Sequence, residues 1–147
     1  MQSTEIKIVD VDEAFLESLW DKVATSGSFY SIGDGITKVH FKKVFYESTL
    51  VIELEGGISR FEECKDFVEV HVLVFGHSFY RNAKQSLQDI YHLAAGIFQN
   101  KPIRCMIPSE MKGFLRLPEA AGMHKIGTQS RLLTGVPVTC TVFEWRP

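Results

Sequence analysis

The sequence predicts a mixed α/β fold, an α+β arrangement in which helices flank a mixed sheet. Residues 67–75 read FVEVHVLVF, with a valine at each even position and Glu69 and His71 on the opposite face. This period of two is typical of a strand. Residues 83–98 place apolar side chains three or four positions apart, as an amphipathic helix does. The polar loop between them leads a strand directly into a helix N-terminus, which can bind an anion.

The other elements follow from their local patterns. Asp10 is expected to cap a first helix that stops before Gly27, and Asp34 a second helix with Val39 facing the core. Gly56-Gly57 is expected to form a hairpin turn, and Pro118 to interrupt a later helix. The expected elements are strand 5–9, a helix between 10 and 27, helix 36–46, strands 50–54 and 58–61, strand 67–75, helix 83–98, strand 102–107, a two-part helix at 109–121, and strands 123–133 and 138–145.

This order, β-α-α-β-β-β-α-β-α-β-β, contains no repeat and no linker, so residues 1–147 are expected to form one domain. Hydrophobic residues make up 45% and charged residues 23%, as in soluble globular proteins. The chain lacks an apolar run of about 20 residues and a signal-peptide core, which predicts a cytoplasmic protein without a membrane partner. Its net charge of −2 argues against nucleic acid. Its three cysteines, without a C-x-x-C pair, support neither zinc nor a disulfide framework.

The element order, with a central strand–loop–helix followed by a strand and a helix ending in A-A-G-M, resembles the GNAT fold of acyl-CoA N-acyltransferases. Residues 116–128, RLPEAAGMHKIGT, are similar to the helix-to-strand passage of that family. More narrowly, the VHVLV strand, the IPS after the fifth strand and the GMHKIGT segment resemble small GNAT-like proteins of tailed bacteriophages. Some of those carry a head-assembly label.

The family resemblance implies a coenzyme A site in the central loop, where GNAT enzymes have R-x-x-G-x-G/A. The best register here is RNAKQS, with Lys84 in place of the first glycine and no glycine between Gly76 and Gly96. Side chains at glycine positions obstruct the close approach of a pyrophosphate to the main chain. Acetyl-CoA is therefore expected to bind weakly or not at all, and no other cofactor is implied. If it does bind, the resemblance assigns it to Arg81, Asn82, Ala83, Lys84 and Ser86.

The family's catalytic residues are matched only in part. Many GNAT enzymes place a tyrosine on the last helix as general acid, and the A-A-G-M register puts Pro118 there, which has no proton to give. They often carry a glutamate on the central strand as general base. Glu69 is on that strand, and with His71 on the same face it could relay a proton through water. The alternative is that both residues simply form a polar sheet face.

Two function classes remain open from the sequence. The first is a phage-type accessory protein, acting in the host cytoplasm in virion head assembly, that has kept the fold and lost the chemistry. It would bind protein partners, such as virion structural proteins, through exposed aromatic residues. The candidates are Phe29, Tyr30 and Tyr80, which could equally line a cofactor pocket. The alternative is an active acetyl-CoA-dependent N-acetyltransferase, and the missing glycines and Pro118 favour the first class.

Overall fold

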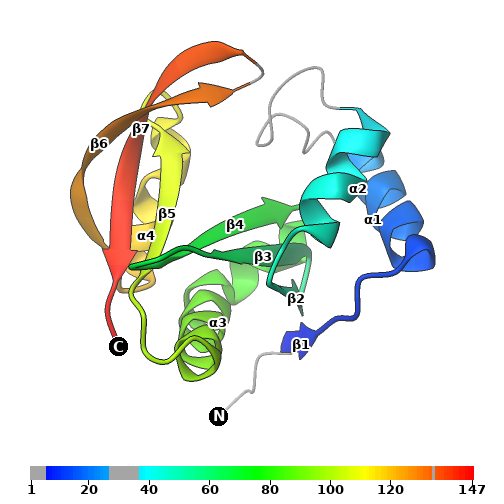
Figure 1. Cartoon of the computed structure of the whole chain (residues 1–147), viewed down its shortest axis with the longest axis horizontal. Coiled ribbons are helices and arrows are strands. Elements are labelled where there is room, and N and C mark those ends of the chain that lie inside the picture. Colours follow the sequence, from blue (N-terminus) through cyan, green and yellow to red (C-terminus); the bar gives the residue numbers. More distant parts are fainter. Residues whose placement is uncertain (1–5, 27–36, 134) are drawn as a thin grey trace.

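A computed structural model describes residues 6–26, 37–133 and 135–147. These residues form one seven-stranded sheet flanked by helices (Figure 1). In chain order the elements are β1 (Ile6–Ile8), α1 (Glu13–Ser26), α2 (Lys38–Tyr46), β2 (Leu50–Leu54), β3 (Gly57–Glu63), β4 (Val68–Val74), the 3-10 helix η2 (His77–Arg81), α3 (Ala83–Ile97), β5 (Ile103–Pro108), the 3-10 helix η3 (Lys112–Phe114), α4 (Arg116–Ala120), β6 (His124–Leu133) and β7 (Val136–Trp145). The predicted α/β class and element order are confirmed.

The sheet is mixed, as predicted. Its strand order is β1-β2-β3-β4-β5-β7-β6, which places β4 in the centre. All neighbouring strands are antiparallel except β4 and β5, which are parallel. A parallel pair needs a crossover connection, and α3 supplies it. The central strand and the central helix are therefore joined as the sequence pattern indicated.

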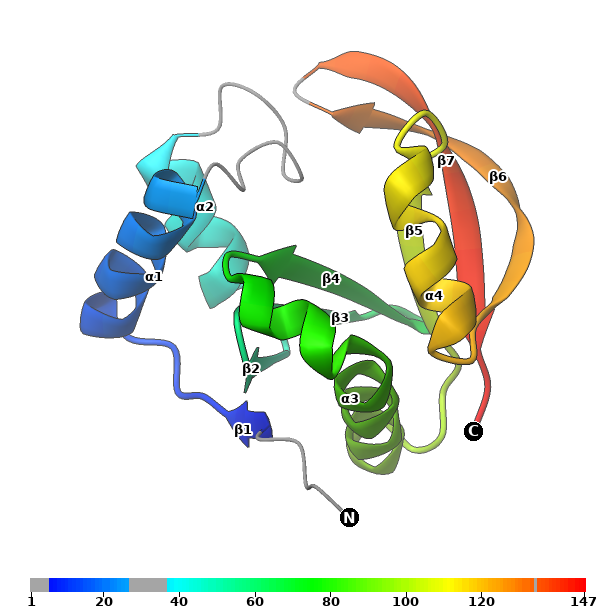
Figure 2. The same cartoon turned by 180° about the vertical axis from the view of Figure 1, so that it is seen from behind.

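The two faces of the sheet carry separate apolar cores. The even-numbered valines of β4 pack with α3, on the sheet face opposite to Glu69 and His71; this cluster includes Val68, Val70, Val72, Val74, Leu87, Ile90 and Tyr91. On the opposite face, Leu73 of β4 packs with α1 and α2; that cluster includes Leu16, Leu19, Val23, Phe41, Phe45 and Ile58. Figure 2 shows α3 and α4 together on one face. The period of two along β4 thus separates the two faces around the site described below.

The two N-terminal helices begin differently from the sequence prediction. Asp12, not Asp10, caps α1 by accepting the N–H of Phe15 at 2.8 Å. Thr37 caps α2, and Asp34 and Gly27 lie outside the described residues. The predicted inward position of Val39 is wrong: its exposed fraction is 78%, whereas that of Phe41 is 1%. Two helical positions differ by about 200°, so burying Phe41 turns Val39 to solvent. None of the described helices is long and apolar enough to cross a bilayer.

The β2–β3 turn supports the loop that follows β4. The turn consists of Glu55 and Gly56, and Gly57 already belongs to β3, so the predicted Gly56-Gly57 turn is displaced by one residue. Gly56 has a φ of 70° and its carbonyl accepts the N–H groups of Phe75 (2.9 Å) and Gly76 (3.0 Å). A Cβ at Gly56 would lie 2.7 Å from the Phe79 nitrogen. The absence of a side chain at Gly56 therefore lets the hairpin hold η2 in place.

The helix predicted at 109–121 occurs in two parts, but Pro118 does not cause the break. Leu115 separates η3 from α4, and Pro118 is the third residue of α4. Within the first turn of a helix the missing N–H of proline breaks no helical hydrogen bond. The Pro118 carbonyl accepts the N–H of Met123 at 2.9 Å, which leads the chain from α4 toward β6.

Candidate functional site

The central parallel strands separate soon after they meet. The paired residues of β4 and β5 are Val68 with Ile103 and Glu69 with Arg104, and beyond them the strands diverge (Figure 1). The N–H of Val68 is donated to Pro102 O at 2.8 Å. Because the main chain of a strand alternates in direction, the even-numbered residues of β4 turn their N–H groups toward β5. Val72 therefore directs its N–H into the gap between the two strands.

A cavity of about 740 Å³ lies at this gap. Side chains from both faces of the sheet line it, including Leu87, Tyr91, Cys105, Leu117 and Pro118 on the α3–α4 side and Phe41, Phe45, Arg60, His71, Leu73 and Arg131 on the other. Its volume is within the range of small-molecule sites, roughly 300–1,000 Å³. Because β4 and β5 diverge, the cavity passes through the sheet. It has one half on the α3–α4 side and a second half on the opposite face.

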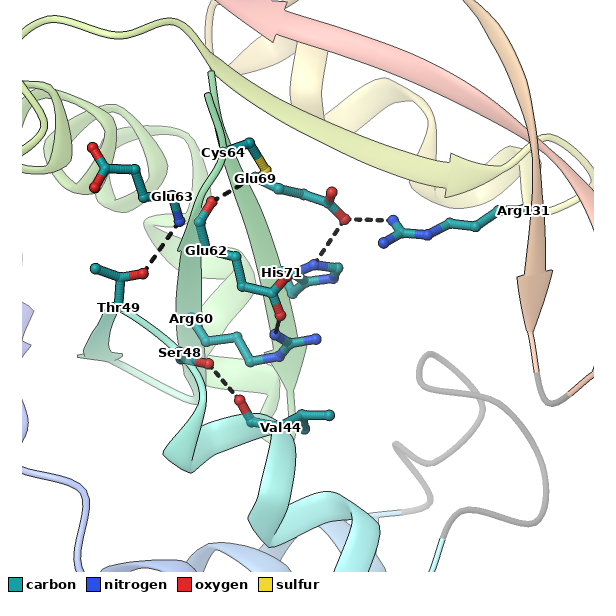
Figure 3. Close-up of polar contacts among 10 residues, drawn as sticks. All are labelled: Val44, Ser48, Thr49, Arg60, Glu62, Glu63, Cys64, Glu69, His71 and Arg131. Atoms are coloured by element: carbon teal, nitrogen blue, oxygen red, sulfur yellow. Dashed lines mark hydrogen bonds and ion pairs between the residues drawn. The ribbon is translucent and has the colours of Figure 1, made fainter. Parts of the chain in front are cut away.

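A buried ion cluster lies beside the second half-site. The Glu69 side chain is only 6% exposed, and its Oε1 accepts a hydrogen bond from Arg131 Nη1 and lies 2.9 Å from His71 Nε2 (Figure 3). That nitrogen is buried and has no aligned hydrogen-bond partner in the described part of the chain. Arg131 comes from β6 at the sheet edge, so the β6–β7 hairpin curves back over β5 to reach β4. The curvature brings Arg131 to Glu69, which lies 62 positions earlier in the sequence, and to its neighbour on β4, His71.

The environment of Glu69 fixes its charge. Burial alone would raise the pKa of its carboxyl, but the contacts with His71 and then Arg131 outweigh burial and lower the pKa from 4.5 to about 2. A carboxylate of such low pKa is a weak base near neutral pH. The geometry therefore suits Glu69 to hold His71 and Arg131 in position better than to take a proton itself.

Glu69→Gln should lower the unfolding free energy at neutral pH and make it depend less on pH in the acid range. Because the folded-state pKa of Glu69 lies below the ordinary 4.5, the unfolded chain binds more protons between about pH 2 and 4.5, and stability rises with pH there. The contribution is complete above pH 4.5 and is lost toward pH 2. The shift corresponds to at most about 3 kcal/mol, which solvent around the partly exposed Arg131 reduces to about 1–2 kcal/mol.

Urea unfolding at pH 3 and pH 7 measures this effect. Glu53→Gln is the matched control, because Glu53 is exposed on β2 and its replacement should change the unfolding free energy by less than about 0.5 kcal/mol. An equal difference between wild type and Glu69→Gln at the two pH values would contradict the role assigned to this carboxylate.

Comparison with known proteins identifies the fold through solved structures and not through sequence similarity. No protein-family model matches the sequence, and no curated protein is similar to it in sequence. Solved structures are similar. A GNAT-family acetyltransferase from Bacillus anthracis superposes with a TM-score of 0.75 at 14% identity, covering 98% of this chain and 96% of that one. An N-acetyltransferase from Staphylococcus aureus Mu50 gives 0.76 at 11% identity, with 99% and 98% covered. The chain has the GNAT fold.

A third similar structure was solved with ligands. The microcin C7 self-immunity acetyltransferase MccE, in complex with acetyl-CoA and AMP, superposes with a TM-score of 0.75 at 10% identity, covering 97% of this chain and 93% of that one. Identities this low establish the fold alone. None of the three structures is described as a virion protein, so the narrower phage resemblance receives no support from them.

The loop residues predicted to contact a cofactor lie around the start of α3. Arg81 ends η2 and Lys84 lies in the first turn of α3, and both are exposed. Asn82 precedes the helix without a side-chain capping bond. Ala83 and Ser86 are buried, and the Ser86 N–H is already donated to Asn82 O at 2.8 Å. Any phosphate contact from this GNAT-fold loop would therefore come from the basic side chains and the first N–H groups of α3, and it stays a prediction.

The predicted aromatic patch is only partly described. Tyr80 is 54% exposed, packs edge-on against Phe79 at 5.4 Å between ring centroids, and lines the cavity. Phe29 and Tyr30 lie outside the described residues. Their proposed role in binding a partner is therefore still a prediction, and Tyr80 alone does not distinguish a protein-binding patch from a pocket wall.

Two further cavity residues were not predicted as functional. Tyr91 of α3 was expected only as a core residue, but it lines the cavity, and burial raises the pKa of its hydroxyl well above 10. Arg131 had no local signal, because its contact depends on the curvature of β6. Burial raises the pKa of the Cys105 thiol to about 12, so this cavity cysteine is a poor nucleophile. The described residues contain no group of three or more potential metal ligands.

Proposed function

We propose that the protein is an acyl-CoA-dependent N-acyltransferase that transfers an acetyl group from acetyl-CoA to an amine. The observation that carries this proposal is the continuous cavity at the β4–β5 gap. One half of the cavity adjoins the start of α3, and the other adjoins the buried Glu69–His71–Arg131 cluster, of which His71 and Arg131 line the wall. A two-sided site of this kind suits two substrates that meet at the gap.

The residues present fit acetyl-CoA despite the missing glycines. The exposed cations of Arg81 and Lys84 flank the helix start, where the first N–H groups have no partner within the helix, and this combination favours phosphate. Apolar side chains such as Leu87 and Leu117 line the path from there into the gap. When bound, acetyl-CoA supplies an acetyl group activated as a thioester. With acetyl-CoA bound in the gap, the Val72 N–H would be available to stabilise negative charge on the thioester oxygen.

Proton transfer is assigned to His71. Histidine is the residue type whose charge changes near neutral pH. Nε2 of His71 faces the Glu69 carboxylate at 2.9 Å, so the proton acceptor is the other ring nitrogen, Nδ1, of this side chain, which is 30% exposed and lines the cavity. It can accept the proton that the amine loses on attack, while Glu69 stabilises the resulting positive charge. The Tyr91 hydroxyl, protonated because burial raises its pKa, can donate a hydrogen bond toward the departing sulfur. Tyr91 would then take the general-acid role that Pro118 cannot take, because proline has no proton to donate.

Calorimetry with acetyl-CoA should detect binding, and acetyl-CoA at about 100 times its Kd should raise the unfolding free energy by about 2.7 kcal/mol. Arg81→Ala with Lys84→Ala should weaken binding at least about tenfold, since hydrogen bonds to charged groups contribute roughly 1.5–3 kcal/mol each. Lys7→Ala with Lys65→Ala, two exposed lysines on β1 and in the β3–β4 turn, is the control and should leave the Kd unchanged. Absence of binding at millimolar acetyl-CoA would refute the proposal.

The assembly role stays a prediction from the sequence resemblance. The cavity and the buried cluster favour a small-molecule reaction over a protein-docking surface, and no described feature specifically favours a virion partner. Retained acetyl-CoA binding would remove the main argument for that role, which was the loss of the glycine loop.

A further inference from the structure

The charged side chains on the cavity wall are all of one sign. Arg60 and Arg131 line it, as do His40, His71 and His77, and no Asp or Glu lines it among the described residues. This does not follow from composition, because the whole chain has 18 acidic residues and only 16 lysines and arginines. The acids that pair with these arginines, Glu62 and Glu69, are not part of the wall.

Arg60, His71 and Arg131 gather in the half of the cavity away from α3, whereas His77 belongs to η2, which leads into α3. Arg60 of β3 and His71 of β4 are cross-strand partners, so they lie side by side on one face of the sheet. Arg131 points toward them from β6, across the gap (Figure 3). The amine acceptor would enter this half, since the other half adjoins α3 and the proposed acetyl-CoA site.

Both guanidinium groups retain donors for a ligand. Arg60 uses Nη1 on Glu62, and Arg131 uses Nη1 on Glu69 and Met106 Sδ; the described residues provide no other hydrogen bond to either group. A guanidinium has five N–H donors in a planar fork that suits carboxylate and phosphate. The paired glutamates fix the two forks in position, so a ligand anion would find them already oriented.

We infer that the acceptor is a small amine that also carries an anionic group, a carboxylate or a phosphate, held by Arg60 and Arg131. This inference rests on the proposed acyltransferase function and specifies its substrate class. Phe41, Phe45 and Met106 give the same half of the cavity an apolar wall, which suits an aliphatic or aromatic body between the two polar ends. A polycationic amine does not fit, because its remaining ammonium groups would face arginines and meet no carboxylate on the wall.

The test compares amines that differ only in the acid. With the protein saturated by coenzyme A, calorimetry measures binding of phenylalanine against phenethylamine, and of phosphoethanolamine against ethanolamine, with spermidine as the polycation. At least one acid-bearing amine should bind tenfold or more tightly than its partner, and the pair that responds identifies carboxylate or phosphate. Arg60→Gln should remove most of this preference and leave the affinity for phenethylamine or ethanolamine unchanged.

Arg104→Gln is the control, because Arg104 lies on the same sheet face, paired with Glu144 at 2.8 Å, but does not line the cavity. It should keep the preference. Equal binding within both pairs, failure of every acid-bearing amine to bind, or preferred binding of spermidine would overturn the inference. If coenzyme A binds and any of these occurs, the acceptor assignment is wrong while the acyltransferase proposal stands; if coenzyme A itself does not bind, the acyltransferase proposal fails first.

Discussion

Val70→Asp should destabilise the protein severely, so that it unfolds at a much lower urea concentration than wild type. Val70 is 3% exposed in the core between β4 and α3, so the substitution buries a carboxylate without a partner. Such a change costs several kcal/mol, about half or more of the stability of a typical domain. Val72 is a weaker test of the fold, because it is only partly buried against the same core. Urea unfolding followed by circular dichroism measures the loss.

Val39→Asp provides the matched control for this substitution. It makes the same chemical change at a side chain that is 78% exposed near the start of α2, where a negative charge is tolerated or slightly favourable. We expect an unfolding free energy within about 0.5 kcal/mol of wild type. Similar losses in the two variants would mean that β4 is not the central strand of the sheet.

The fold could be predicted from the sequence because its signals are local. The alternating valines of β4 and the three- and four-residue spacing in α3 each fix a buried face within one element. Errors occurred where two solutions are close in sequence. Asp10 and Asp12 are both competent caps for α1. In α2, Val39 and Phe41 are both apolar but lie on opposite sides of the helix, so burial of Phe41 leaves Val39 in solvent.

The site could be predicted only in part, because its members meet through tertiary structure. Glu69 and His71 were expected on one face of the central strand, and they do lie together. Arg131 is 60 residues further along the chain from His71, and its contact with Glu69 requires the β6–β7 hairpin to curve over β5. No residue pattern within β6 predicts that curvature. The one-sided charge of the cavity wall was hidden for the same reason.

The contact with Arg131 changes what Glu69 can do. A glutamate alone on a sheet face would be a candidate base, as the family resemblance implied. With Arg131 and His71 attached, its pKa falls to about 2 despite burial. Each unit by which the pKa of a base lies below the working pH reduces the driving force for proton transfer to that base. In the proposed reaction these three residues have separate roles: Glu69 and Arg131 would provide fixed charge, and His71 would accept the proton.

His71→Asn should lower kcat for acetyl transfer by about 100-fold or more and leave the Kd of acetyl-CoA unchanged, because positioned general bases contribute roughly 10²–10⁴-fold. Asparagine keeps a polar side chain of similar reach but accepts no proton. Glu69→Gln should lower kcat less, because it keeps the proton acceptor and removes only the carboxylate that stabilises positive charge on His71. Steady-state rates between pH 5 and 9 measure both variants.

His124→Asn is the control for the loss of a histidine, because His124 is exposed on β6 and does not line the cavity; its rate should match wild type. The variant that loses more of its kcat, His71→Asn or Glu69→Gln, identifies the base. If Glu69→Gln loses 100-fold or more while His71→Asn keeps most of its activity, the glutamate takes the proton. The low pKa assigned to Glu69 in the free protein would then have to rise once the amine and acetyl-CoA exclude water from the gap.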